Sequence, residues 1–464
     1  MLLLGCAAAT GRRVPPTAAP TSSRRARASS SGGGPPTELA RAPLGTLSVS
    51  KWRLDNGLEV VLLPDPQATA VSYTTWFRVG SRNEDATAGE TGLAHLFEHL
   101  MFTQTKNAPP NAFDTQMEAV GGSSNAMTYY DFTAYVDDVP PAEVATAVRL
   151  EADRMVNLDL RKKQVETERD VVAEERLSSV EDSVDGVLDE LMYQQAFKKH
   201  PYRWPVIGLM KDIKAFTQAN AAAFYRKYYA PNNAVIVVAG KIDEAAMLDM
   251  IADAYGAMAP SKKLPSGDAA PERAPAAEIR TTVTRPVPAD RLVIGFPAPA
   301  LGAADRAAFE VVNEILAGGP SSRLNRALLV ERQWASSVHG DIAPTRDPGL
   351  YAIWIQMMKG HTADEAERLV MDAVAELAAR PLPAAELGKA AARLETQFWQ
   401  QLASSHGRAE TVGQFEIAGG GFQRLLERGA EYARLTPADV QRAAAAYLAG
   451  GARSVVVARP EGAS

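Results

Sequence analysis

The fold and the chemistry of this chain centre on residues 92–102, which read GLAHLFEHLMF. They place His95, Glu98 and His99 in a His-x-x-Glu-His pattern, and apolar residues fill most of the other positions. On an α-helix, positions i and i+4 lie one turn apart on the same face, so both imidazoles can reach one metal ion. The pattern therefore predicts a helix that carries two metal-ligating histidines.

Glu98 falls on a neighbouring part of the same helix face. There it can accept a hydrogen bond from a water molecule at the metal without being a ligand itself. This inverted zincin arrangement predicts zinc, which activates the water, and a carboxylate that takes the proton. The alternative is an ordinary amphipathic helix with two half-buried histidines, because a pattern this short also occurs by chance.

A second helical region offers a third ligand. Val165, Glu168, Val172 and Glu175 recur at three- and four-residue intervals and form one stripe of a helix, whereas Glu174 is rotated by about 100° from Glu175. Carboxylates on a core-facing stripe require a cation or a donor. We therefore expect Glu175 to complete the metal site and Glu168 to support it from behind the ligands. The alternative is a solvated face of a Glu-rich helix.

The bulk composition limits the classes of protein and of site. The chain has 464 residues, 46% hydrophobic and 22% charged, with a net charge of −6, which is typical of a globular protein with two or three domains. No basic stripe is present in the sequence, so nucleic acid is not an expected partner. Because Cys6 is the single cysteine, metal ligands must come from histidine and carboxylate. No apolar run is long enough to predict a transmembrane helix.

Changes in composition divide the chain into four parts. Residues 1–44 are rich in Ala, Ser, Gly, Pro and Arg, and we expect a disordered targeting or tether segment. Residues 45–260 contain both motifs and form the predicted catalytic domain. Residues 261–277 are rich in Pro, Ala and Lys, which predicts a linker, and residues 278–464 form a second domain.

The second domain repeats the first. Residues 435–459 align without gaps on residues 216–240, with coinciding Thr, Ala, Tyr and Val residues and the same helix–turn–strand order. This similarity indicates an internal duplication. Since the second copy has no His-x-x-Glu-His pattern, we expect its histidines not to bind metal; they are His339, His361 and His406.

The N-terminal segment leaves two interpretations of targeting open. Leu3-Leu4-Gly5-Cys6 resembles the end of a bacterial lipoprotein signal, which predicts a lipid anchor at Cys6 and a place in the bacterial cell envelope or periplasm. The charged and apolar regions that precede such a site are missing, so this interpretation requires translation to start upstream of Met1. The alternative is an Arg- and Ser-rich transit peptide, which predicts the mitochondrial matrix.

Together these segments resemble the pitrilysin/insulinase family of zinc metallopeptidases, in particular its short-chain branch with the mitochondrial processing peptidase β-subunit and bacterial relatives. The resemblance covers about residues 45–460 and is carried by GLAHLFEHLMF, GGSSNAMTYYDFTAYV, ETERDVVAEE and LAGGPSSRLNRALLVERQWASSV. It implies an α+β fold with two homologous domains, each a mixed, mainly antiparallel sheet packed against helices. It also implies that unfolded peptides or presequence-like segments are hydrolysed.

The resemblance assigns roles to particular residues. It implies one zinc ion per chain, held by His95, His99 and Glu175, with Glu98 as general base and Glu168 as a further catalytic residue. It also implies three substrate-binding residues. Asn125 and Ala126 belong to an edge strand that pairs with an extended substrate, and Phe97 is the third. A turn leading into a strand is the structural role that Asn125 and Ala126 would have in any case.

One departure from the family pattern bears on assembly. Family members that work alone, and the non-catalytic partners of those that do not, carry an Arg and a Tyr seven residues apart in the second half. Here Leu329 and Ser336 occupy the corresponding positions in the run LLVERQWASSV. We therefore expect a heterodimer in which a homologous subunit supplies these donors. A non-catalytic scaffold or peptide-binding subunit of a larger assembly is the alternative function.

Overall fold

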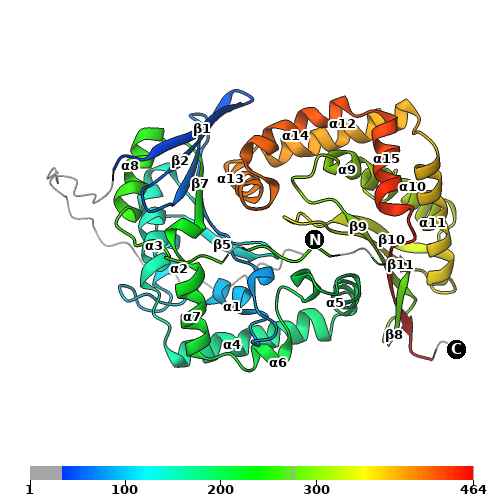
Figure 1. The fold of residues 1–464 in the computed structure, drawn as a ribbon, viewed down its shortest axis with the longest axis horizontal. Helices are drawn as coiled ribbons and strands as arrows, with labels where there is room; N and C mark the ends of the chain where they lie inside the picture. Colours follow the sequence, from blue (N-terminus) through cyan, green and yellow to red (C-terminus); the bar gives the residue numbers. More distant parts are fainter. Residues whose placement is uncertain (1–33, 266, 273–274, 276, 463–464) are drawn as a thin grey trace.

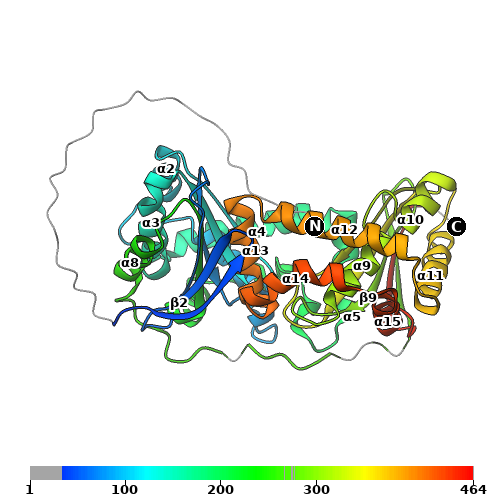
Figure 2. The ribbon, with the colours of Figure 1, turned by 90° about the horizontal axis from the view of Figure 1, so that it is seen from above.

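Two α+β halves lie side by side along the long axis of the molecule (Figures 1 and 2). The computed structural model describes residues 34–265, 267–272, 275 and 277–462. Each half consists of one sheet packed against helices, and within each sheet one pair of strands is parallel and the others are antiparallel. The predicted α+β class with two homologous units is confirmed.

The first half is built on a seven-stranded sheet in the order β1-β2-β3-β7-β4-β6-β5. Its strands are β1 (Thr37–Leu44), β2 (Leu47–Arg53), β3 (Glu59–Pro64), β4 (Val71–Phe77), β5 (Ser123–Thr128), β6 (Thr133–Val139) and β7 (Ala234–Gly240). Its helices are α1 (Leu93–Leu100), α2 (Ala112–Ala119), α3 (Val144–Asn157), α4 (Lys162–Arg176), α5 (Val184–Ala196), α6 (Met210–Ile213), α7 (Gln218–Tyr228) and α8 (Glu244–Tyr255).

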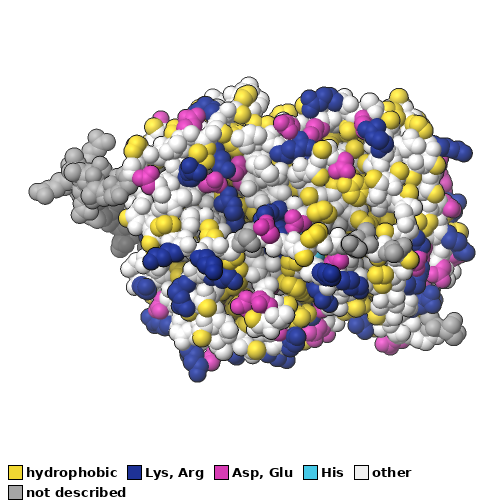
Figure 3. Space-filling view, viewed as in Figure 1, with side chains coloured by type: hydrophobic (Ala, Val, Ile, Leu, Met, Phe, Trp, Pro, Cys, Tyr) yellow, Lys and Arg dark blue, Asp and Glu magenta, His cyan; other side chains and the backbone are white. Residues whose placement is uncertain are grey.

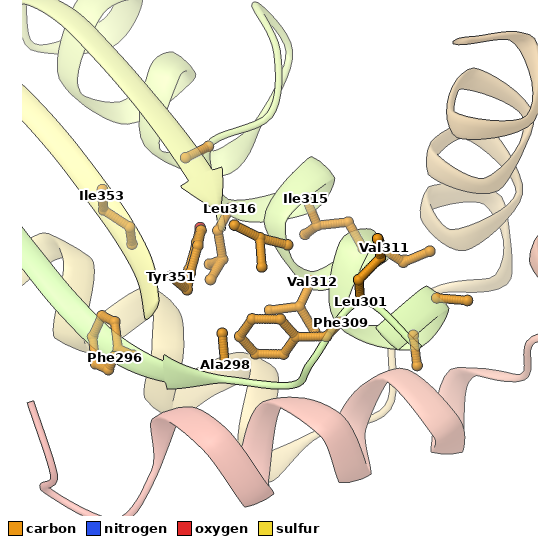
Figure 4. Close-up of a cluster of buried hydrophobic side chains, with 14 of the residues drawn as sticks. Phe296, Ala298, Leu301, Phe309, Val311, Val312, Ile315, Leu316, Tyr351 and Ile353 are labelled. Carbon is orange, nitrogen blue, oxygen red and sulfur yellow. The ribbon is translucent and has the colours of Figure 1, made fainter. Parts of the chain in front are cut away.

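The second half is built on a five-stranded sheet in the order β10-β11-β9-β12-β8. Its strands are β8 (Ile279–Arg285), β9 (Arg291–Ala298), β10 (Ala335–Ile342), β11 (Gly349–Met357) and β12 (Ser454–Pro460). Its helices are α9 (Arg306–Leu316), α10 (Arg323–Asn325), α11 (Ala363–Ala379), α12 (Ala384–Gln401), α13 (Ser405–Gln414), α14 (Phe422–Arg434) and α15 (Pro437–Leu448). Figure 4 shows Phe309, Val312 and Leu316 of α9 directed toward Ala298 and Tyr351 of the sheet.

The strand order confirms the internal duplication. In the first sheet β3-β7-β4-β6-β5 follow one another with a parallel β3–β7 pair and antiparallel neighbours after it. In the second sheet β8-β12-β9-β11-β10 repeat this order, again with one parallel pair at β8–β12. The aligned segments 216–240 and 435–459 correspond to α7 with β7 and to α15 with β12.

Each half lends a helix to the sheet of the other half. Helix α13 packs on β4 and β7 of the first sheet, and α5 packs on β8, β9 and β12 of the second sheet (Figure 1). Strand β7 is buried on both faces, which explains its continuous apolar sequence AVIVVAG. Val235 and Val237 face the core shared with the second half, whereas Ile236 and Val238 face the helices of the first half. The two halves therefore share their cores.

Close packing at Gly413 holds α13 on the first sheet. A Cβ atom added to Gly413 would lie 2.1 Å from Cε2 of Trp76, a fully buried side chain whose Nε1 donates to Thr74 Oγ1. Because overpacking a dense core forces side chains and backbone to shift, Gly413→Ala is expected to lower the free energy of unfolding by about 1–3 kcal/mol. Urea denaturation followed by circular dichroism measures this change.

Gly388 supplies the matched control for that substitution. It lies in α12, and an added Cβ atom would meet nothing within 4 Å. Gly388→Ala should therefore raise the stability by up to about 1 kcal/mol through helix propensity alone. Equal stability of Gly413→Ala and the wild-type chain would contradict the close packing between α13 and Trp76.

The N-terminal boundary of the fold differs from the prediction. Residues 37–44 were expected to lie in the disordered segment, but they form β1, which pairs antiparallel with β2 and ends at the buried Leu44. Backbone hydrogen bonds to β2 order this segment, although Leu44 is its one buried residue. Cys6 and the arginine-rich stretch, on which the targeting predictions depend, lie outside the described residues. Between Tyr255 and Ile279, where a linker is predicted, the described residues form no helix or strand.

The surface and the helices bear on two further expectations. None of the helices in the described part of the chain is long and apolar enough to cross a membrane. On the face drawn in Figure 3, basic and acidic side chains are interspersed, without a broad field of one sign. This pattern gives no support to a nucleic-acid-binding surface there.

Candidate metal centre

Helix α1 presents the motif residues because its apolar residues are buried on the opposite side. Leu93, Ala94, Leu96, Phe97 and Leu100 are buried in the core of the first half. This burial fixes the rotation of the helix about its axis. His95, Glu98 and His99 are left on the partly exposed face, and the side chains of both histidines are 12% exposed.

Helix α4 supplies the facing carboxylates. Val165 and Val172 are fully buried, and Glu168 and Glu175 share their stripe with side chains that are 18% and 22% exposed. Glu174 is exposed, as its rotation on the helix predicts. Because α4 packs against α1, this stripe lies opposite the histidines.

Three side chains from the two helices meet at one point. His95 Nε2 lies 3.7 Å from Glu175 Oε1, and His99 Nε2 lies 3.4 Å from Glu175 Oε2. One ligand atom from each of His95, His99 and Glu175 lies within 4.8 Å of the other two. This is the one such cluster of His, Cys, Asp and Glu side chains among the described residues.

The donor set fits a zinc ion. Two imidazole nitrogens and one carboxylate oxygen are a typical protein ligand set for catalytic zinc, which keeps a further position for water or substrate. Glu175 Oε2 is buried and has no hydrogen-bond partner among the described residues. A buried carboxylate oxygen without a donor is costly, and a cation held between it and the imidazoles removes that cost.

The carboxylates also control the protonation of the histidines. Burial lowers the pKa of His95. Burial acts in the same direction on His99, but Glu168 and Glu175 outweigh it and raise the pKa of His99 to about 9. Burial would raise the pKa of Glu175, yet His99 and His95 hold it below its usual value. Without metal, a proton on His99 therefore balances the Glu175 carboxylate at neutral pH.

Zinc binding is expected to depend on pH through His99. A metal ligand must be a neutral imidazole, and with a pKa of about 9 the neutral fraction of His99 falls tenfold for each pH unit below that value. The apparent zinc affinity should therefore rise about tenfold per pH unit from pH 7 to 9, as competition with a chelator measures it. In Glu168→Gln the pKa of His99 should be lower, so that the rise ends at a lower pH. An affinity that is constant between pH 7 and 8.5 in the wild-type chain would contradict this expectation.

Glu168 lies behind His99, on the side away from the other two ligands. Its Oε2 atom is 3.7 Å from His99 Nδ1, while its Oε1 atom accepts a hydrogen bond of 3.0 Å from Gln164 Nε2. A carboxylate at this nitrogen favours the tautomer that leaves Nε2 free for a metal. Glu168 is therefore placed to orient His99, and it is not in the ligand group.

Phe97 does not lie where a substrate could touch it, so its prediction as a substrate-binding residue is wrong. The side chain is fully buried, and its ring lies 5.3 Å from that of Phe224 and 5.1 Å from that of Tyr229. Its carbonyl oxygen accepts a hydrogen bond from the Tyr135 hydroxyl. The physical reason is helix rotation: Phe97 lies between the motif residues in sequence but on the opposite, core-facing side of α1.

Asn125 and Ala126 lie on β5, the last strand of the first sheet. Strand β5 pairs only with β6 among the described strands, and Asn125 and Ala126 lie opposite Val136 and Tyr135. Asn125 is exposed, whereas Ala126 is buried. Because α1 packs beside β5 and β6, the free edge of the sheet lies next to the helix that carries the histidines.

The two departures from the family pattern lie in the second half. Leu329 is partly buried against the core of that half, and Ser336 is exposed on the edge strand β10, where its Oγ donates to the carbonyl of Gln356. Neither side chain offers a cationic or phenolic donor. His339, which is not an expected ligand, lies on β10, where its ring stacks on Trp354.

Two buried charged residues near the site were not identified from the sequence. The Glu84 carboxylate accepts hydrogen bonds from the N–H groups of Gly92 and Ala94, at the start of α1. Arg176, next to Glu175, donates to the carbonyl of Gly208 and to Glu190. Glu84 lies eight residues before Gly92, and Arg176 contacts residues that lie 14 and 32 positions further along the chain, so neither follows the short repeat of a helix or a strand.

Comparison with known proteins identifies the family. Residues 59–208 match the family model of Insulinase (Peptidase family M16), and residues 215–394 match that of the Peptidase M16 inactive domain. All four residues of the predicted chemistry, His95, Glu98, His99 and Glu175, lie within the first match. The second match covers a stretch that contains none of them.

Several relatives resemble the chain over most of its length. The zinc protease PqqE of Helicobacter pylori is 29% identical over 88% of this chain and 92% of its own. The mitochondrial-processing peptidase subunit beta of Blastocladiella emersonii is 25% identical over 85% of each chain. The crystal structure of a protease from Helicobacter pylori superposes with a TM-score of 0.85 at 27% identity, over 89% of this chain and 99% of that one. A peptidase M16 inactive domain from Pseudomonas fluorescens shares the fold, with a TM-score of 0.81 at 19% identity over 90% and 99% of the two chains. The chain therefore belongs to the pitrilysin/insulinase family of zinc peptidases, M16.

Proposed function

We propose that this chain is a zinc-dependent endopeptidase that hydrolyses unfolded peptides or presequence-like segments. The observation that carries the proposal is the meeting of His95, His99 and Glu175, with ligand atoms within 4.8 Å of one another, on two helices that are far apart in sequence. Glu98 lies on the same face as the histidines but outside the ligand group. Two imidazoles, one carboxylate and a separate carboxylate base are what metal-assisted hydrolysis of a peptide bond requires.

Each of the site residues has a separate role in the proposed reaction. His95, His99 and Glu175 would hold one zinc ion, which when bound acidifies water and polarises a carbonyl group. The Glu98 carboxylate takes a proton from the attacking water and passes it to the leaving amine. Glu168, whose Oε2 atom lies 3.7 Å from Nδ1 of His99, would keep that imidazole in the tautomer and orientation that binding requires.

The substrate would bind as an added strand. The free edge of β5 next to α1 offers backbone N–H and C=O groups to an extended peptide, through a stretch that includes Asn125 and Ala126. Main-chain pairing of this kind is insensitive to side chains and fits a peptidase for unfolded segments.

A homologous partner subunit completes the site in this proposal. Leu329 and Ser336 leave the second half without the Arg and Tyr donors of the family pattern. One missing donor to a developing oxyanion lowers kcat by about 10²–10³-fold. We therefore propose a heterodimer in which the partner carries both donors. We propose the bacterial cell envelope as the location, because Leu3-Leu4-Gly5-Cys6 resembles the end of a bacterial lipoprotein signal.

The test combines metal analysis with peptide cleavage. The chain would be purified alone and together with a homologous subunit that carries the Arg and Tyr, and each preparation would be assayed for zinc content and for cleavage of a quenched peptide library. We expect one zinc per chain in both cases and cleavage at least about 10²-fold faster in the complex. Full activity of the chain alone would contradict the heterodimer. Zinc binding without cleavage in the complex would contradict the peptidase and favour a peptide-binding subunit.

A further inference from the structure

Helix α1 begins without a capping side chain of its own. Its N-cap residue is Gly92, which has a φ of 98° and no side chain to accept a hydrogen bond. The first turn of a helix leaves N–H groups without helical partners. In α1 that turn carries His95, so the way these groups are satisfied decides how firmly this ligand is held.

Glu84, eight residues before Gly92, takes the place of the missing cap. Its Oε2 atom accepts a hydrogen bond of 2.9 Å from Gly92 N, and its Oε1 atom accepts one of 2.8 Å from Ala94 N. The side chain is 5% exposed, so water cannot replace it readily. Because each oxygen holds one N–H group, the carboxylate fixes both the position and the direction of the first turn of α1.

The start of α1 is also locked to the end of α4. Gly92 lies against Gly208 so closely that a Cβ atom on Gly208 would be 2.5 Å from Gly92 Cα. The carbonyl of Gly208 accepts a hydrogen bond of 2.7 Å from Arg176, the residue after Glu175. The same guanidinium donates to Glu190, at 2.8 Å. The loop at Gly208 therefore joins the helix of the two histidines to the helix of the third ligand.

We propose that Glu84 is a positioning residue for the metal centre, which sets His95 and His99 against Glu175 through the start of α1 and the contact between Gly92 and Gly208. This inference rests on the proposed function in that it takes these three residues as metal ligands. Glu84 does not touch the ligands. It acts by fixing the backbone from which two of them extend, and Arg176 fixes the backbone of the third.

Metal affinity of the full chain tests this role independently of catalysis. In Glu84→Gln one of the two acceptor oxygens is replaced by an NH2 group. This NH2 donor then faces a backbone N–H donor at the start of α1. We expect zinc to bind about 10-fold more weakly, the lower end of the range for a residue hydrogen-bonded directly to a metal ligand, because Glu84 acts only through the backbone. The visible spectrum of bound Co²⁺, which reports the ligand geometry, should change. At saturating metal, kcat should fall while KM stays constant.

Two variants separate positioning from simple stability. Val237→Ala removes volume from the fully buried strand β7, away from the site, and should lower the melting temperature without changing zinc affinity. Glu84→Asp keeps two acceptor oxygens on a shorter side chain and should bind zinc with an affinity between those of Glu84→Gln and the wild type. If Glu84→Gln does not fold, Arg176→Lys tests the same connection from α4, and a weaker affinity is again expected.

The outcomes distinguish this proposal from the proposed function. A wild-type zinc affinity in Glu84→Gln, or in Arg176→Lys where that variant is used, would overturn the positioning role even if the chain cleaves peptides. If the wild-type chain cleaves no peptide but Glu84→Gln still binds zinc more weakly, the positioning role would be supported and the peptidase contradicted. If Val237→Ala loses as much zinc affinity as Glu84→Gln, the weaker binding would result from lower stability of the fold, and the inference would be overturned.

Discussion

Glu98→Gln is expected to bind zinc as the wild-type chain does and to cleave peptides about 10²–10⁴-fold more slowly, the range for the loss of a general base. The amide has the shape of the carboxylate but cannot take a proton at neutral pH. Because Glu98 is not in the ligand group of His95, His99 and Glu175, its substitution leaves all three donors in place. Zinc content and kcat, measured on the same preparation with its partner subunit, check both parts of the prediction.

Glu174→Gln is the control for that experiment. It makes the same chemical change on the exposed face of α4, next to Glu175, where the side chain points away from the site. Its zinc content and its kcat should both equal those of the wild type. A normal kcat in Glu98→Gln would refute the assignment of the base, and loss of zinc in that variant would mean that Glu98 is a ligand.

His99→Ala is expected to lose both zinc and activity. It removes one of three ligands and leaves Glu175 without the imidazole that lies 3.4 Å from its Oε2 atom. The zinc affinity should fall by more than about 100-fold. That value is the upper end of the range for losing only a residue that is hydrogen-bonded to a metal ligand. Zinc content after gel filtration and the cleavage rate at micromolar zinc measure the two effects.

His339→Ala provides the comparison for the histidine change. His339 lies on β10 in the second half and stacks on Trp354, outside the ligand group. Its substitution should leave zinc content and cleavage rate unchanged. Equal zinc content in His99→Ala and the wild type would contradict the assignment of His99 as a zinc ligand.

The sequence predicts the centre of the site well because the evidence is local. The i, i+4 spacing of the histidines and the seven-residue spacing of Glu168 and Glu175 each describe one face of one helix. In the structure α1 and α4 turn these faces toward each other. The strand order likewise repeats the duplication that residues 216–240 and 435–459 indicate.

What the sequence did not predict depends on contacts that the periodicity of a helix or a strand does not encode. Strand β1 is ordered by its pairing with β2, and a composition rich in polar and small residues does not reveal a pairing partner. Phe97 lies one residue before Glu98, yet the rotation of α1 places it in the core. Glu84 acts on the site through backbone groups at the start of α1, and Arg176 acts through the carbonyl of Gly208, at spacings that no helix or strand repeat encodes. An amphipathic pattern shows that a helix such as α13 has an apolar face, but not which sheet covers it.

The reciprocal placement of α5 and α13 makes the chain equivalent to a domain-swapped dimer whose two protomers have been fused end to end. Either half on its own would leave exposed the face of its sheet that the other half's helix covers. The second half holds none of the predicted ligands His95, His99 and Glu175, yet its helix α13 completes the core of the first half. The second half, which carries none of the three predicted metal ligands, therefore cannot be deleted without exposing the apolar face of the first sheet that α13 covers.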